Sequence, residues 1–438
     1  MTYPEHVKSA LWADIDEMAV NPGRFATNPK TDFSRNRKIN FTNLLRLSIA
    51  MESGSTNHEL IKYFDYDDKV PSCSAFYQQR SKLLPDAYSH LLKTFNSHFP
   101  LTKYKDKYYL VACDGCEFNI TRNPDDPESF HPPSGKSTKG FNMLHTISFY
   151  DVLSKRYLDL ITQPARKKNE FQAICDLMNR YSYGGKPIII ADRGFSSYNV
   201  FAHAIENGLY FAIRAKDLNV KRLLKLDKLP KQLDTTTDIM LTRTQSKKNR
   251  LHPEKAHSYR YICKNVTFDY LGEETNIEYP MSLRIVRFEV ADGIYENIIT
   301  NLPADEFPLE EIRQIYHLRW NIETSFRDLK HTIGTSNFHS KKVKYIEQEI
   351  WARMILLNFC SIIIAHVVIE KTDTKHIHQV NFAMAMKICH GFLRLKAKEK
   401  PPNIEGLIGK FTLPIRPNRN YVRQHRFQLP ASFAYRFS

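Results

Sequence analysis

Residues 187–192 read Pro-Ile-Ile-Ile-Ala-Asp, and residues 108–115 read Tyr-Tyr-Leu-Val-Ala-Cys-Asp-Gly. Each stretch is a short run of apolar residues that ends in an aspartate, with a glycine one or two residues later. A strand as uniformly apolar as 187–191 is typical of the centre of a sheet that is covered on both faces. The two stretches therefore predict buried strands that each end in an exposed carboxylate, Asp114 in one and Asp192 in the other, with the glycine turning the chain away.

The sequence around these strands predicts an α/β fold. Three strands that can pair as hairpins, followed by strand–helix–strand units, indicate a mixed sheet flanked by helices. Residues 216–300 do not continue this alternation of strands and helices. Their segments rich in Thr, Val, Ile and Tyr predict a mainly β insertion. The expected strands are 107–113, 142–150, 156–162, 187–191 and 209–214, and the expected helices are 169–182 and 197–207.

Residues 1–103 are predicted to form a helical DNA-binding domain. Phe41–Met51 has helical apolar spacing, Thr56–Glu59 fits a capping box, and residues 72–84 form a further polar and basic helix. A short helix, a turn and a basic helix outline a helix-turn-helix reader of DNA, an outline that many small helical bundles share. The side chains expected to face DNA are Gln79, Arg80 and Lys82.

The charge of the chain indicates a polyanionic partner, and nucleic acid is the first candidate. The formal net charge is +16, and residues 386–438 hold 11 Lys and Arg against 2 Asp and Glu. Residues 371–438 are therefore predicted to be a basic tail. Seven unpatterned cysteines favour reduced thiols and a cytoplasmic protein. The longest apolar run, within 354–369, is predicted to be a buried core helix rather than a membrane span.

A helix expected from about residue 308 carries the most informative polar stripe. It reads YHLRWNIETSFRDLK over residues 316–330. Its apolar residues recur at spacings of three and four and form one face, while Tyr316, Arg319, Glu323 and Lys330 form a stripe beside that face. The alternative interpretation is a solvated face with an ordinary Arg319–Glu323 ion pair.

Asp114, Asp192 and Glu323 together fit one chemistry. Three carboxylates can hold two Mg²⁺ ions, for which Mn²⁺ can substitute, and such a pair can activate and stabilise the oxygens of a phosphodiester exchange. The cations Arg193, Arg319 and Lys330 would then grip phosphates, and Tyr316 would contact a phosphate or a base. Nearby Glu117, Asp151 and Asp159 are interpreted as ordinary surface or turn residues, and His145 as a packed histidine.

The motif Tyr316-x2-Arg319-x3-Glu323-x6-Lys330 resembles the Tyr-Arg-Glu-Lys signature of bacterial insertion-sequence transposases of the DDE class. VACDG at 111–115 and ADRGF at 191–195 are similar to the two aspartate motifs of that family. The resemblance covers roughly residues 40–370 and implies an RNase H-like core that holds Mg²⁺ on Asp114, Asp192 and Glu323. It also implies cleavage at the two ends of a mobile element and joining of 3′-OH ends to target DNA.

The resemblance implies double-stranded DNA as partner, both as terminal inverted repeats and as target, and a homodimer on the two joined ends. The expected RNase H-like catalytic domain comprises 104–215 and 301–370. Two alternatives remain: an RNase H-type nuclease without strand transfer, and a non-catalytic DNA-binding protein derived from a transposase.

Overall fold

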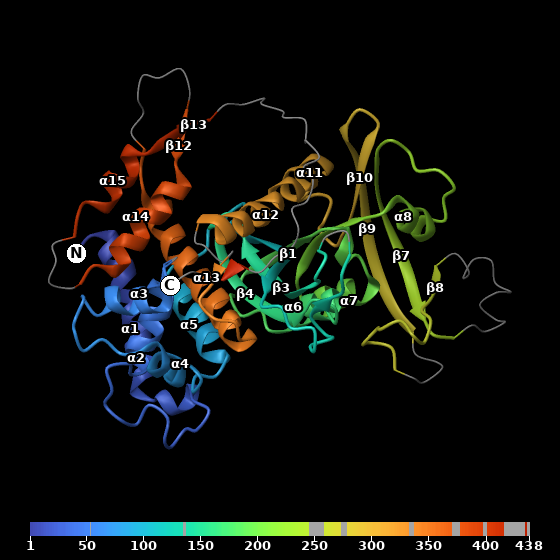
Figure 1. Ribbon diagram of the computed structural model, residues 1–438. Helices are drawn as coiled ribbons and strands as arrows, with labels where there is room; N and C mark the ends of the chain where they lie inside the picture. The colour runs from blue at the N-terminus through green and yellow to red at the C-terminus, as the bar shows by residue number, and fades with distance from the viewer. Residues whose placement is uncertain are drawn as a thin grey trace.

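The computed structural model describes residues 1–52, 54–134, 137–244, 258–272, 278–332, 337–369, 377–396, 401–415 and 434–435. Within these residues a ten-stranded sheet runs through the centre of the molecule (Figure 1), in the order β2-β3-β1-β5-β6-β10-β9-β7-β8, and β4 also pairs with β3. Strands β1, β5 and β6 are parallel, while β3 and β10 flank them antiparallel. The predicted mixed α/β sheet is confirmed.

The strands of this sheet lie close to their predicted positions. The bounds are Tyr108–Ile120 (β1), Phe130–His131 (β2), Phe141–Asp151 (β3), Arg156–Pro164 (β4), Lys186–Ala191 (β5), Tyr210–Ala215 (β6), Leu233–Thr242 (β7), Tyr259–Tyr261 (β8), Glu278–Ala291 (β9) and Ile294–Thr300 (β10). Residues 187–191 of β5 are buried, and residues 188–191 pair on both sides, as the apolar run predicts.

The first strand is longer than predicted. β1 does not end at Asp114 but continues to Ile120, because Asp114 still pairs with Ser148 of β3. What ends at this point is the parallel ladder with β5, whose last pair joins Cys113 to Ala191. From Asp114 onward β1 therefore stays paired with β3 but no longer with β5.

Gly115 has a different role from the predicted one. It lies inside β1, where a Cβ atom would come within 2.7 Å of Cε1 of His145 on the neighbouring β3. The glycine is required by close packing against a buried histidine and not by a turn of the chain.

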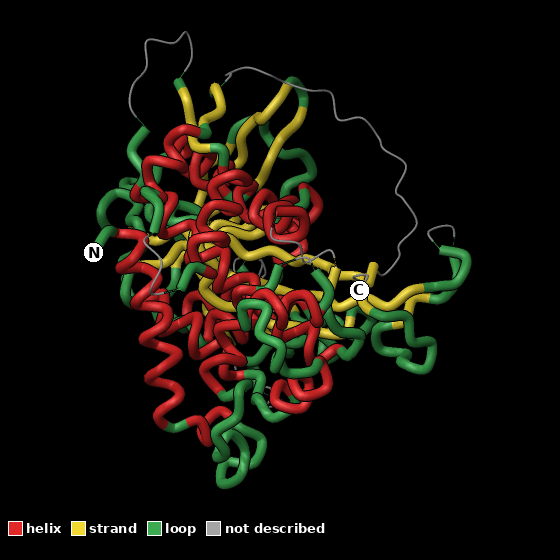
Figure 2. The backbone as a smooth tube through the Cα atoms, turned by 60° about the vertical axis from the view of Figure 1, so that its left-hand side comes forward, coloured by secondary structure: helices red, strands yellow, loops and turns green. Residues whose placement is uncertain are grey.

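Helices cover both faces of the sheet. Alternate residues of the central strands point to opposite faces, and those on one face share a core with α6 (Glu170–Asn179), α7 (Tyr198–Glu206) and α8 (Asp217–Leu224). The residues on the other face share a second core with α13 (Val343–His366) and the helices around it. Figure 2, turned so that the left-hand side of Figure 1 comes forward, shows helices in front of much of the sheet.

Helix α13 lies at the centre of this helical block. In the part of the chain that the structure describes, it is the one helix long and apolar enough to cross a membrane, and 83% of its most apolar window is buried inside the protein. It packs against α1, α2, α5, α14, α15 and β4. The predicted buried core helix is confirmed.

The N-terminal helices share a core with α13 and with the sheet. Their bounds are Tyr3–Val20 (α1), Phe41–Ala50 (α2), Thr56–Tyr63 (α3), Cys73–Arg80 (α4) and Asp86–Ser97 (α5), with a short 3₁₀ turn at Pro22–Phe25. The predicted helices are present, but α3 is capped by the side chain of Ser55, which accepts from the backbone N–H of His58. The cap is one residue earlier than predicted.

The expectation that Gln79 and Arg80 face outward from α4 is wrong. Gln79 is 4% exposed and Arg80 is 1% exposed. Arg80 donates from Nε to Gln348 on α13 at 2.8 Å and pairs through Nη1 with Glu349 at 3.2 Å. Polar partners on α13, more than 260 residues away in sequence, draw this face of α4 into the core.

Two predicted segments are more closely joined to the fold than expected. The insertion begins with α8, and its strands extend the central sheet because β10 pairs with β6. The predicted basic tail is folded where the structure describes it: α14 (Phe382–Arg394) and α15 (Ile404–Lys410) pack against α13. Two short ladders complete this part, β12 (His378–Val380) with β13 (Thr412–Pro414) and β11 (Asn337–Phe338) with β14 (Ala434–Tyr435). Residues 371–376, 397–400, 416–433 and 436–438 of the tail lie outside the described residues.

Candidate active site

Three carboxylates from distant segments line one cavity. Asp114 lies on β1 where the ladder with β5 ends, Asp192 follows β5 directly, and Glu323 comes from α12 (Trp320–Arg327). The cavity has a volume of about 550 Å³ and is also lined by Lys330 and Phe326. The carboxyl ends of parallel strands share one edge of a sheet, which is why the two aspartates meet there.

The helix that carries Glu323 is positioned by its apolar face. The predicted single helix consists of α11 (Leu309–Leu318), α12 and a π-helical turn η3 (Asp328–Thr332). Arg319 joins α11 to α12 with helical backbone angles, so the chain keeps its direction. Ile315, Ile322 and Leu329 are fully buried, which confirms the apolar face. This packing lays α12 against β1 and turns Glu323 toward Asp114.

Arg319 lies between two of the carboxylates. Its Nη1 is 3.4 Å from Oδ2 of Asp114, and its Nη2 is 3.0 Å from Oε1 of Glu323, while the whole residue is 3% exposed. Burial works against its charge, but the acidic neighbours outweigh burial and raise the pKa of the guanidinium above its ordinary value. The expected Arg319–Glu323 pair is present, and it forms part of a larger bridge.

Asp114 is held in an environment that disfavours its charge. Burial raises the pKa of Asp114 to about 6, against the opposing effects of the Gly115 N–H, which donates to it at 2.8 Å, and of Arg319. The charges of Glu323 and Asp192 raise this pKa further. Such crowding of like charges is common where carboxylates serve chemistry rather than stability.

Asp192 has its own set of partners. The hydroxyl of Tyr316 donates to Oδ1 of Asp192 at 3.4 Å, and Nη1 of Arg214 lies 3.8 Å from the same oxygen. Arg214 also pairs with Glu296 on β10 at 3.2 Å. Because Tyr316 is 2% exposed, its ring is buried in this arrangement and does not present a face for stacking.

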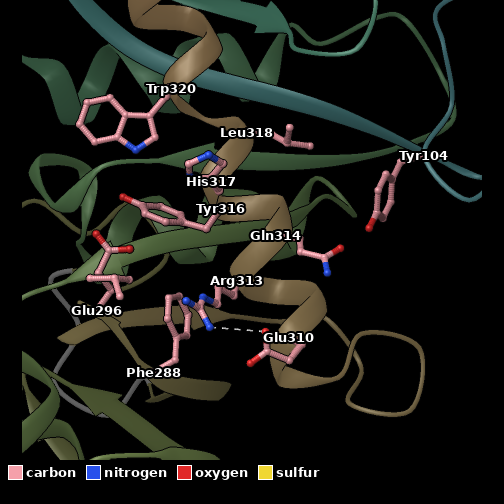
Figure 3. Close-up of a pocket in the computed structure, with 11 residues that line it drawn as sticks. Tyr104, Phe288, Glu296, Glu310, Arg313, Gln314, Tyr316, His317, Leu318 and Trp320 are labelled. Atoms are coloured by element: carbon pink, nitrogen blue, oxygen red, sulfur yellow. Dashed lines mark ion pairs between the residues drawn. The ribbon is translucent and has the colours of Figure 1, made fainter. Parts of the chain in front are cut away.

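Tyr316 lines a second cavity, which has a volume of about 600 Å³ (Figure 3). Tyr316 and Glu296 lie on the same side of it, and α11 supplies much of the remaining wall, including the Arg313–Glu310 ion pair. Tyr316 and Glu296 thus belong to the walls of this cavity while they connect, directly or through Arg214, to Asp192.

The other predicted phosphate contacts differ in position. Lys330 lines the carboxylate cavity from η3, and its Nζ lies 5.3 Å from the ring centre of Phe118. Arg193 is exposed in a short 3₁₀ turn beside Asp192 but is not among the residues that line the cavity. Lys82 lies beyond the end of α4 and pairs with Asp32 at 3.7 Å.

Sequence reasoning missed a polar network on another part of the cavity wall. His145 is 2% exposed, as a packed histidine should be, and its Nε2 lies 3.1 Å from Glu170. Lys168 pairs with Glu117 at 3.1 Å and with Glu170 at 3.2 Å. Interaction with His145 and Lys168 lowers the pKa of Glu170 to about 2 despite burial. No motif marks these residues, which only the strand register and the start of α6 bring together.

The donor set suits a hard divalent cation. Mg²⁺ and Mn²⁺ prefer carboxylate oxygen, and Asp114, Asp192 and Glu323 supply three such groups to one cavity. Across the described residues, no three His, Cys, Asp or Glu side chains already converge as a metal-ion cluster. Asp114 and Glu323 are instead turned onto the guanidinium of Arg319.

Comparisons with known proteins give one family match and one structural match. The family described as "Transposase DDE domain" matches residues 105–359. A cryo-EM structure of the piggyBac transposase synaptic complex with hairpin DNA aligns with a TM-score of 0.45 at 10% identity, covering 95% of this chain and 87% of that chain. No curated protein matches the sequence. Because the matched segment is more than half of the chain, this protein belongs to the family of the transposase DDE domain.

Proposed function

We propose that this protein is the DNA transposase of an insertion sequence, which cuts both ends of the element and joins the 3′-OH ends to target DNA. The observation that carries the proposal is the meeting of Asp114, Asp192 and Glu323 in one cavity, with Arg319 and Lys330 beside them. All five residues lie inside the segment that matches the transposase domain.

Asp114, Asp192 and Glu323 are the proposed ligands of two Mg²⁺ ions. DDE transposases generally use divalent metal ions. When bound, such ions supply a Lewis acid for both the attacking and the leaving oxygen of a phosphodiester exchange. The protein's contribution is to hold the three carboxylates at the end of a rigid ladder and on a helix packed against it.

The cations and the tyrosine of the signature position the DNA. Lys330 is a point charge at the cavity wall that suits a phosphate beside the cut. Tyr316 is buried and donates to Asp192, so its proposed role is to fix the orientation of that carboxylate. Arg193, exposed beside Asp192, is available to the backbone of the bound DNA.

The proposed partner is double-stranded DNA, first as the terminal inverted repeats of the element and then as its target. The net charge of +16 supports association with a polyanion. We infer that residues 1–103 contribute to recognition of the element's ends through the surface that does not pack on α13. Gln78 is exposed on that surface, whereas Gln79 and Arg80 are buried. A homodimer on two joined ends, in the bacterial cytoplasm, completes the proposal.

The test uses purified protein, Mg²⁺ and a DNA fragment that carries the sequences flanking the gene. Wild-type protein should cleave both flanks and join the ends to a second DNA. Asp114→Asn, Asp192→Asn and Glu323→Gln should each abolish cleavage and leave DNA binding largely intact, whereas Asp176→Asn, at a half-buried position of α6 outside the cavity, should cleave normally.

Each alternative function gives a distinct result in the same test. Cleavage without joining would support a nuclease of the RNase H type. Binding without cleavage, unchanged in the three variants, would support a non-catalytic DNA-binding protein. Retained cleavage in a single variant would remove that residue from the site.

A further inference from the structure

The contacts that Arg319 makes in this structure are incompatible with its expected role in binding a phosphate. A guanidinium grips a phosphate by offering two parallel N–H groups. In this structure Nη1 faces Asp114 and Nη2 faces Glu323, and Nε is buried without a hydrogen-bond partner. With the residue only 3% exposed, neither amino group is available to DNA while these pairs persist.

The same two pairs occupy carboxylate oxygens that divalent ions would need. Oδ2 of Asp114 and Oε1 of Glu323 both face the guanidinium. A single positive charge thus pairs with two of the three carboxylates that line this cavity. One set of oxygens cannot hold the guanidinium and a divalent ion at full strength together.

We infer that Arg319 is a placeholder cation, which neutralises Asp114 and Glu323 in the metal-free enzyme and becomes free to bind a DNA phosphate only when divalent ions take its place. This inference rests on the proposed function. It gives Arg319 two alternating partners, the carboxylates and the phosphate, and it makes divalent-ion binding and phosphate binding depend on each other.

Lys330 shows why this role belongs to Arg319. Lys330 lines the same cavity with its ammonium over Phe118, and among the residues that the structure describes, Asp114 and Glu323 form ion pairs with Arg319. The rigid fork of Arg319 reaches both carboxylates at once, which a point charge on a flexible stem does less well. The exchange therefore concerns one side chain, and its consequences are measurable by substituting that side chain alone.

Linkage sets the expected result. If divalent ions free Arg319 for phosphate, they raise DNA affinity, and DNA raises the affinity for the ions by the same factor. Couplings of this kind are typically about 5- to 150-fold. Arg319→Gln removes the competitor for the carboxylates, so in the absence of DNA this variant should bind Mg²⁺ about tenfold more tightly than the wild type.

The experiment has two measurements that do not depend on turnover. Isothermal titration of the DNA-free protein with Mg²⁺ gives the metal affinity. Fluorescence anisotropy with a labelled flank duplex, in Ca²⁺ and in EDTA, gives the effect of a divalent ion on DNA affinity. The matched control is Arg327→Gln, which removes the same charge from an exposed residue of the same helix.

We expect Arg319→Gln to bind Mg²⁺ more tightly and to lose most of the Ca²⁺-dependent gain in DNA affinity, and Arg327→Gln to match the wild type in both. Equal or weaker Mg²⁺ binding by Arg319→Gln would overturn the inference. Should that variant fail to fold, Arg319→Lys retains the charge with one point of contact, and metal affinity no tighter than the wild type would be the overturning result.

Failure of the inference is distinct from failure of the proposed function. Wild-type protein that cleaves its flanks with Mg²⁺, combined with unchanged metal and DNA binding in Arg319→Gln, refutes only the placeholder role. Wild-type protein that neither binds divalent ions nor cleaves the flanks refutes the proposed function and, with it, the inference.

Discussion

Replacing Asp114 by asparagine should stabilise the metal-free protein above about pH 6 while it abolishes DNA cleavage. Burial raises the pKa of the Asp114 carboxyl from an ordinary 3.8 to about 6. A shift of about 2 pKa units corresponds to about 3 kcal/mol, because each unit is about 1.4 kcal/mol. Since the side chain is 23% exposed, screening by solvent lowers our expectation to about 2–3 kcal/mol.

The sign of the effect follows from where the proton binds more tightly. The folded protein holds the proton of Asp114 up to about pH 6, whereas the unfolded chain releases it near 3.8. The stabilisation of the folded protein by this proton is therefore complete below pH 3.8, and it is lost as the pH rises through about 6. Asparagine is neutral throughout, so the variant keeps the stability that the wild type loses.

The assay is urea unfolding of both proteins in EDTA at several values between about pH 4 and about pH 8. The difference in free energy of unfolding between variant and wild type should be smallest at the acid end and reach its plateau above about pH 7. Asp151→Asn is the matched control, because burial also raises the pKa of Asp151 to about 6 and this residue lies outside the cavity. The Asp151→Asn variant should show the same increase of this difference with pH, and it should retain DNA cleavage. A gap for Asp114→Asn that does not change with pH would refute the reasoning from burial and like charge.

Three further predictions concern stability and DNA binding. Arg80→Met should cost about 3–5 kcal/mol in urea unfolding, because it removes the guanidinium that pairs with buried Glu349 and donates to Gln348, whereas exposed Gln78→Ala should cost less than about 0.5 kcal/mol. An Arg80 variant of normal stability that loses DNA affinity would restore Arg80 as a DNA contact. Gly115→Ala should lower the free energy of unfolding by about 1–3 kcal/mol in the same measurement, since the added Cβ meets buried His145. An unchanged urea midpoint would show that β3 shifts to accommodate the added methyl group. Affinity for DNA should fall linearly on a logarithmic salt scale, and a flat response would argue against phosphate contacts as the source of binding.

Local patterns in the sequence predicted the central strands and the apolar face of the Glu323 helix. An uninterrupted apolar run needs burial on both faces, and a spacing of three and four needs a helix, so both predictions rest on chemistry close in the chain. The extension of β1 beyond Asp114 depends on pairing with β3, which no local pattern contains. The apparent turn glycine is for this reason a packing glycine.

The wrong and missing predictions of residue positions share one physical cause. Arg80 reads as a surface cation because its partners, Gln348 and Glu349, lie more than 260 residues later. The network of Glu117, His145, Lys168 and Glu170 is likewise assembled by strand register and a helix start. Charged side chains are the least predictable from sequence, since burial depends on a partner that only the tertiary fold supplies.

The place of α13 in the chain has a consequence for biosynthesis. The helices α1, α2 and α5 pack on it, yet it begins at residue 343, about 250 residues after α5 ends. At about 5–20 residues per second, the ribosome needs roughly 12–50 s to supply that missing partner. During this interval the N-terminal helices pack on one another but lack α13 as the partner for the rest of their apolar faces, and a chain that stops before residue 343 never receives it. We therefore expect truncated translation products to be degraded or to aggregate, rather than to persist as DNA-binding fragments that compete with the full-length transposase.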